Sequence, residues 1–180
     1  MCVCNCVWAC YCVRIPACVH VYARLSILAA VDERVVGGQN CGRHQQPYQV
    51  ALMRSPKIVR CGGVLIHPCW VLTAAHCALN SPISMRLGEY SLRTTEGTEQ
   101  FIKSTQSFVH PNYNSTTHDS DLMLLKLQNV ARINNYVRTI DLPDNCPEPN
   151  TECVVSGWGT IKTPQGVIFG MDGWMDGWIV

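Results

Sequence analysis

The chain has 180 residues, a length typical of one domain. Its 14 Lys and Arg residues nearly balance its 13 Asp and Glu residues, so the net charge of +1 suggests neither a basic surface for nucleic acid nor an acidic tail. Apolar residues make up 47% of the sequence, which argues against wholesale disorder, and no run of about 18 apolar residues predicts a membrane span.

The first 24 residues alternate cysteine with valine, tyrosine, histidine and tryptophan. A secretory signal has a basic segment before its apolar stretch, but no basic residue precedes Arg14 and the apolar run 6–13 is short. Three interpretations stay open: a translated simple repeat, a thiolate site for a soft metal, and a degenerate secretory segment. We treat residues 1–34 as an atypical cysteine-rich leader or pro-segment.

Residues 35–165 contain short apolar runs bounded by Gly, Pro, Asn and Ser, which is typical of β-strands. No long amphipathic helix separates these runs, so the sequence predicts an all-β domain, either a sandwich or a barrel. The predicted strands are Gln49–Met53, Gly63–His67, Trp70–Ala74, Ser84–Leu87, Gln100–His110, Asp121–Leu127 and Cys153–Gly157.

Residues 166–180 change character and contain the tetrapeptide Met-Asp-Gly-Trp twice, at 171–174 and 175–178. An aromatic docking tail is one interpretation. A change of reading frame or intron read-through is the other. Either way, we predict that this tail is not part of the domain at 35–165.

Four motifs stand in a fixed order within the middle segment. They are RVVGG at 34–38, CGG at 61–63 followed by WVLTAAHC at 70–77, DSDLMLLKL at 119–127, and VSGWGT at 155–160. Together they resemble the trypsin-like serine proteases of the chymotrypsin fold, and most of all the tissue-kallikrein branch. The resemblance implies a complete first antiparallel barrel of six strands within 35–145, with most of the second barrel missing.

His76 and Asp121 are the candidate catalytic residues. A lone histidine after an apolar strand is usually a packed or surface residue, but the resemblance implies a disulfide between Cys61 and Cys77 that holds the turn of His76. It also implies that His76 is the general base and that Asp121 orients it. Asp119 is the nearby competitor, since a spacing of two would place it on the same face as Asp121. The family pattern selects Asp121, which stands immediately before the apolar run.

Arg34 and Val35 form the expected activation site, because the resemblance implies that cleavage between them frees the Val35 ammonium of a zymogen. The sequence has no Gly-Asp-Ser-Gly-Gly-Pro stretch, from which the family takes its nucleophilic serine and its oxyanion donors. We therefore expect this chain to be a truncated, inactive member. Two alternatives stay open: a non-catalytic binding or decoy protein, and an incomplete version of an active protease.

Asn114 begins the sequon Asn-Ser-Thr in a turn-rich stretch, so we predict a glycan there if the chain is secreted. Histidine and cysteine spacings match no metal motif, and no EF-hand calcium loop occurs, so we predict neither a metal nor a cofactor. The resemblance implies extracellular localisation, with protein or peptide substrates and protease inhibitors as partners. We predict no nucleic-acid or membrane partner.

Overall fold

The structure, a computed structural model, describes residues 39–144, 154–158 and 178–179. The chain divides into two compact units: Gly42–Leu142, and Met1–Cys41 together with Pro143–Val180. In the part that the structure describes, no helix is long and apolar enough to cross a membrane. The predicted leader 1–34, including Arg34, and most of the tail 166–180 lie outside the described residues.

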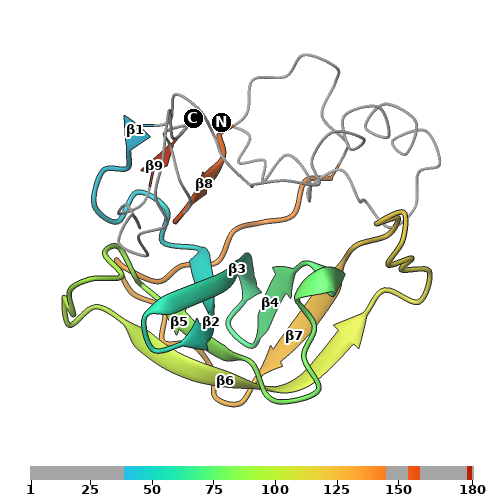
Figure 1. The fold of residues 1–180 in the computed structure, drawn as a ribbon. Coiled ribbons are helices and arrows are strands. Elements are labelled where there is room, and N and C mark those ends of the chain that lie inside the picture. Colours follow the sequence, from blue (N-terminus) through green and yellow to red (C-terminus); the bar gives the residue numbers. More distant parts are fainter. Residues whose placement is uncertain (1–38, 145–153, 159–177, 180) are drawn as a thin grey trace, which may run out of the picture. The chain divides into compact units, whose positions relative to one another are not determined.

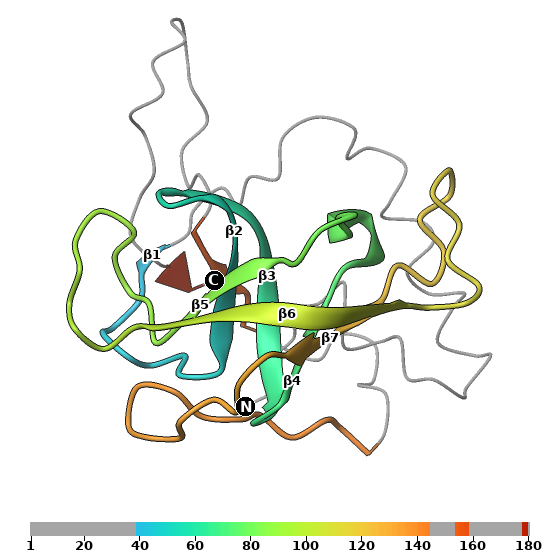
Figure 2. The same cartoon turned by 90° about the horizontal axis from the view of Figure 1, so that it is seen from below.

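Six antiparallel strands close into a barrel within Gly42–Leu142, seen from two directions in Figures 1 and 2. The order around the barrel is β2-β3-β4-β7-β6-β5, and β5 pairs with β2 to complete the circle. Closure gives each strand two neighbours and removes exposed sheet edges. The predicted all-β fold with a complete six-stranded antiparallel barrel is therefore confirmed. Its strands are β2 (Gln49–Ser55), β3 (Ile58–His67), β4 (Trp70–Thr73), β5 (Ser84–Leu87), β6 (Gln100–Val109) and β7 (Met123–Leu127).

The barrel interior is filled by the alternate residues of each strand. On β7, Met123, Leu125 and Leu127 are buried while Lys126 faces solvent. Burying one such leucine side chain contributes roughly 1.5–3 kcal/mol to folding. The period-two pattern in the sequence thus becomes one apolar core.

Strand β3 begins five residues before its predicted start, at Ile58 rather than Gly63. The predicted strand starts at the second glycine of the pair Gly62-Gly63, but in the structure both glycines lie inside the strand. A Cβ on Gly63 would come within 2.9 Å of Val71 Cγ1, so glycine is needed where β3 packs closely against its neighbours. The strand predicted to start at Asp121 begins two residues later, at Met123.

A small three-stranded sheet lies in the other unit. It is formed by β1 (Gln39–Asn40), β8 (Ser156–Gly157) and β9 (Trp178–Ile179), in the order β1-β9-β8. Ile179 pairs with Gln39 on one side and with Ser156 on the other. The sequence did not predict a strand at 178–179, because two residues are too few to show a period.

Candidate active site

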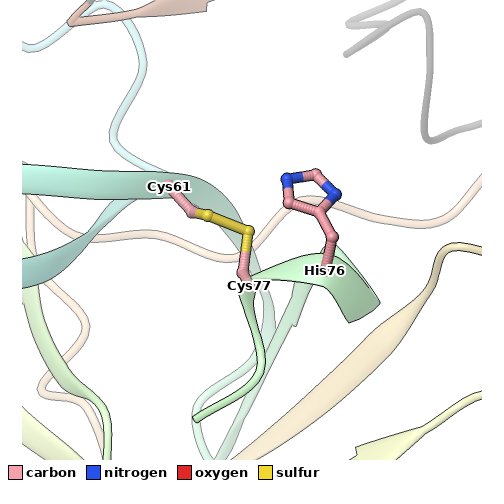
Figure 3. A group of neighbouring side chains, drawn as sticks. All are labelled: Cys61, His76 and Cys77. Carbon is pink, nitrogen blue, oxygen red and sulfur yellow. A yellow bond between two sulfur atoms is a disulfide. The ribbon is translucent and has the colours of Figure 1, made fainter. Parts of the chain in front are cut away.

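His76 lies on η3 (Ala75–Cys77), a single turn of 3₁₀ helix directly after β4. The hydroxyl of Thr73, the last residue of β4, donates a hydrogen bond of 2.7 Å to the carbonyl of Gly62 on β3. One residue after His76, Cys77 forms a disulfide with Cys61, also on β3, as Figure 3 shows. A strand end and a covalent bond therefore fix the backbone on both sides of the imidazole.

Asp121 meets His76 through both of its carboxylate oxygens. Oδ2 lies 2.6 Å from the imidazole Nδ1, and Oδ1 accepts a hydrogen bond of 2.8 Å from the backbone N–H of His76. The aspartate side chain is 12% exposed and the histidine side chain 38% exposed. Because a carboxylate only accepts hydrogen bonds, the short contact requires a proton on Nδ1. That tautomer leaves Nε2 as the nitrogen that can take up a proton.

The expectation that Asp119 lies on the same face as Asp121 is wrong. Asp119 is exposed and accepts a hydrogen bond from the hydroxyl of Thr117, at 2.9 Å, instead of facing His76. The strand has not begun at this point, and Ser120 adopts a left-handed backbone conformation with φ of 54°. The spacing of two therefore does not place the two carboxylates on one face.

His118 is a neighbour of the pair that sequence reasoning assigned no role. Its Nδ1 lies 3.7 Å from Asp121 Oδ2, and its ring centroid lies 6.0 Å from that of His76 at 81°. The side chain is 60% exposed. In the same loop, burial and then the negative charge of Asp121 raise the pKa of Tyr113. In the sequence, the one feature that could have indicated this contact is that His118 stands three residues before Asp121.

Among the described residues, two groups of side chains are close enough to share a metal ion, and His76 belongs to both. The nearest donor atoms of His76, His118 and Asp121 lie within 4.8 Å of one another. A metal on Nδ1 of His76 would replace its hydrogen bond to Asp121, so this cluster cannot serve both purposes at once. Cys61 and Cys77 form the other set with His76, but their sulfurs are already bonded to each other.

A second acidic region lies in the loop between β5 and β6. The side chains of Glu89 and Glu96 are 0% and 8% exposed, and Glu89 Oε1 and both Glu96 oxygens have no hydrogen-bond partner among the described residues. Arg86 Nη1 donates to Glu89 Oε2 at 3.0 Å, and Arg43 Nη1 lies 3.1 Å from Glu96 Oε1. Each of the two carboxylates therefore has an arginine counter-ion, and among the described residues neither glutamate belongs to a group of side chains close enough to share a metal ion.

Asn114 lies on the exposed loop between β6 and β7. Its side-chain oxygen accepts hydrogen bonds from the backbone N–H groups of Thr116 and Thr117, at 2.8 and 3.3 Å. Cys69 is a half-buried thiol in the turn between β3 and β4. The activation pair Arg34 and Val35 lies outside the described residues.

A closed six-stranded antiparallel barrel with an Asp–His pair at the ends of two strands is the first barrel of a chymotrypsin-fold protease. Residues 35–169 match the family Trypsin, and the chain belongs to that family. It is 46% identical to Kallikrein-14 of Homo sapiens over 134 residues, 74% of this chain and 50% of that protein. It is 48% identical to Trypsin V-A of Rattus norvegicus over 131 residues, 73% of this chain and 52% of that protein.

Among solved structures, the chain is similar to neuropsin, a serine protease expressed in the limbic system of mouse brain. The TM-score is 0.70 at 37% identity, over 81% of this chain and 63% of that one. The predicted likeness to trypsin-like and kallikrein-like proteases is therefore confirmed. The chain spans about half the length of the kallikrein and trypsin relatives that it matches.

Proposed function

We propose that this chain is part of a trypsin-like serine endopeptidase in which His76 is the general base and Asp121 orients it. The observation that carries the proposal is the double contact of Asp121 with His76, at 2.6 Å to Nδ1 and 2.8 Å to the backbone N–H. A base must be held in one tautomer with its other nitrogen directed at the nucleophile. Asp121 meets the first requirement, and it would stabilise the imidazolium that forms when Nε2 takes a proton.

In this scheme His76 accepts the proton of a serine hydroxyl during attack on the peptide carbonyl and later donates it to the leaving amine. The nucleophilic serine and the oxyanion N–H donors belong to a Gly-Asp-Ser-Gly-Gly-Pro stretch, which does not occur in the 180 residues. We therefore propose that this chain by itself does not hydrolyse peptides. A longer product of the same gene that contained that stretch would be active.

We further propose that the protease domain comprises residues 35–165 and that cleavage between Arg34 and Val35 activates the full enzyme. Secretion is proposed as well, since the disulfide between Cys61 and Cys77 is typical of an oxidising compartment. Polypeptide substrates and protease inhibitors are then the partners that contact the His76–Asp121 pair.

A chimera tests the roles of the two residues. Residues 35–158 of this chain are joined to the C-terminal half of a trypsin relative that supplies the serine, and hydrolysis of an arginine ester is measured. We expect His76→Ala to lower kcat on the order of a millionfold, and Asp121→Asn to lower it about ten-thousandfold. The control His110→Ala should change kcat/KM by less than about twofold, because that imidazole accepts a hydrogen bond from the backbone N–H of Asn112 in its own loop and does not contact His76 or Asp121 among the described residues.

The outcomes separate the proposed function from its alternative. Loss of activity confined to the His76 and Asp121 variants supports the proposal. A folded chimera that contains the serine and yet hydrolyses no ester refutes it, and leaves the non-catalytic binding interpretation in its place.

A further inference from the structure

Five basic residues gather where the β2–β3 hairpin meets β5 and β6. We call them the basic face: Arg54, Lys57, Arg60, Arg86 and Lys103. No Asp or Glu occurs in residues 34–88, so strands β2 to β5 carry no carboxylate at all. The net charge of +1 for the whole chain therefore conceals a local excess of positive charge.

The pairing of β5 with β6 places the first part of this face on the outside of the barrel. Arg86 lies directly opposite Phe101, and opposed residues of an antiparallel pair project from the same side. The alternate residues Leu87 and Ile102 are buried in the core. Lys103, two residues after Phe101, is exposed and projects outward as well.

The same outer side continues across β2, the neighbour of β5 in the barrel, to β3 (Figure 1). Ala51 on β2 lies opposite Arg86 on one side and Gly62 on the other; because Ala51 itself is fully buried, the exposed residues of the face lie on the strands to either side of it. Arg60, two residues before Gly62, is exposed. Because neighbouring strands lie about 5 Å apart, the face from β3 to β6 spans roughly 15 Å.

The tip of the β2–β3 hairpin is tied to this face. Arg86 Nη2 donates a hydrogen bond to the carbonyl of Pro56, in the turn of the hairpin. Lys57 in the same turn and Arg54 at the end of β2 are both exposed. The guanidinium of Arg86 thus holds the hairpin next to the outer side of β5.

Most of these charges have no internal partner. Among the described residues, no carboxylate lies within 4.0 Å of the charged groups of Arg54, Lys57, Arg60 or Lys103. Arg86 pairs with Glu89, whose side chain is fully buried. Four positive charges therefore face solvent unneutralised, and repulsion between them favours an anionic partner.

Exposed apolar side chains lie among the charges. Phe101 is 65% exposed, with the guanidinium carbon of Arg86 5.0 Å from its ring centroid, and Ile58 at the hairpin is 42% exposed. An aromatic ring and an aliphatic side chain between arginines suit a polypeptide that has both carboxylates and apolar side chains. A sulfated polysaccharide would leave both of them uncovered.

The face is connected to the proposed site through covalent bonds. Arg60 precedes Cys61, and the disulfide of Cys61 joins it to Cys77, the residue after His76. We propose that the basic face binds an acidic segment of a protein substrate or inhibitor that also lies over His76. This inference adds a partner to the proposed function and rests on it, but binding requires no catalysis, so the two can fail separately.

Binding to the refolded, monomeric full chain is the test, measured by fluorescence anisotropy. The probe is a short fluorescein-labelled peptide of Glu and Asp with one Phe and one Leu, and the reference probe has Gln and Asn in place of the acids. We expect saturable binding of the acidic probe only, weakening as salt shortens the screening length to about 8 Å and below. A sulfated heparin fragment is titrated in parallel.

Paired variants locate the site. Lys57→Gln/Arg60→Gln should weaken binding of the acidic probe about tenfold. The control Lys126→Gln/Arg138→Gln removes the same charge from exposed positions elsewhere and should change binding by less than about twofold. Phe101→Ala should weaken binding of this probe more than binding of an all-acidic probe without Phe and Leu. Circular dichroism and the urea midpoint establish that each variant is folded.

Three results overturn the proposal: no salt-dependent binding of the acidic probe, equal losses in the two paired variants, or binding of heparin without binding of the peptide. Loss confined to Lys57→Gln/Arg60→Gln, with the Phe101 effect, supports it. Neither result depends on whether the protease chimera is active.

Discussion

Thr73 and Met123 lie directly opposite each other where β4 pairs with β7. His76 stands three residues after the first, and Asp121 two residues before the second. This one pairing therefore brings together two side chains that are 45 residues apart in the chain. The barrel itself holds the proposed base and its orienting carboxylate. A substitution at Asp121 should therefore change the free energy of unfolding.

Asp121→Ala should lower the free energy of unfolding by about 1–3 kcal/mol, because it leaves the backbone N–H of His76 without its acceptor in a partly buried site. Asp119→Ala is the matched control, since that carboxylate is exposed and bonds only within its own loop. We expect the control to change stability by less than about 0.5 kcal/mol. Urea unfolding followed by tryptophan fluorescence measures both, and equal effects would contradict the predicted difference.

The disulfide between Cys61 and Cys77 closes a loop with a sequence separation of 16. Its replacement by Cys61→Ala/Cys77→Ala should cost about 3 kcal/mol of stability through the larger entropy of the unfolded chain. Cys69→Ala, at a half-buried thiol, is the single-site control and should cost much less. Under reducing conditions the wild-type chain and the double variant should unfold at similar urea concentrations. A large difference that persists with reductant would show that the effect comes from packing.

Asn114 should carry an N-linked glycan when the chain is expressed with an added secretion signal. The sequon is exposed, and its asparagine is already in a tight side-chain turn with Thr116. Digestion with an N-glycan amidase should lower the apparent mass of the secreted chain. Thr116→Val should abolish this shift, whereas Asn112→Gln, outside the sequon, should leave it unchanged. Secreted wild-type chain that shows no shift would refute the prediction.

Glu89 should make stability depend on pH. Burial raises its pKa above the ordinary 4.5, against the opposing effect of Arg86. A raised pKa means that the folded state holds the proton more tightly, so its contribution is present below the ordinary pKa and is lost as pH rises through the higher folded value. As the pH rises above 4.5, the Glu89→Gln variant should therefore lose less stability than the wild-type chain does.

Glu99 provides the control of opposite sign. Burial acts to raise its pKa, but hydrogen bonds from the backbone N–H groups of Glu96, Glu99, Gly97 and Thr98 outweigh burial, and its pKa is lowered. Its contribution is present above the ordinary pKa and disappears as pH falls through the lowered value. On acidification, the Glu99→Gln variant should therefore lose less stability than the wild-type chain does. If both variants shift the pH profile in the same direction, the assignment of these two carboxylates is wrong.

The regular parts of the barrel could be predicted from sequence because local signals and tertiary packing agree there. Ser84–Leu87 alternates buried and less buried residues, and its predicted bounds are those of β5. Gly63 shows the opposite case. Its neighbour Val71 belongs to another strand, and no local pattern shows that a glycine is required at that contact.

The residues around the His76–Asp121 pair could be predicted less well from the sequence. The left-handed conformation of Ser120 turns Asp119 away from Asp121, and a non-glycine residue gives little sign of such a conformation. His118 meets Asp121 because of the same loop geometry. The basic face was missed for a different reason: the net charge of the whole chain averages residues 34–88, which contain no Asp or Glu, with the acidic residues elsewhere.

The last prediction concerns activity of the 180-residue chain. Cleavage after Arg34 would free the Val35 ammonium, but His76 would have no family serine to deprotonate, and no family oxyanion donors would stabilise a tetrahedral intermediate. Loss of the nucleophile alone costs on the order of a millionfold in kcat in a related protease. The purified chain, treated with an activating protease that is then removed, should hydrolyse no Arg, Lys or Tyr ester above background and should not react with a fluorophosphonate probe. A stoichiometric label on any serine of this chain, including Ser120, which directly precedes Asp121 in the sequence, would overturn the prediction and identify a nucleophile that the family pattern does not contain.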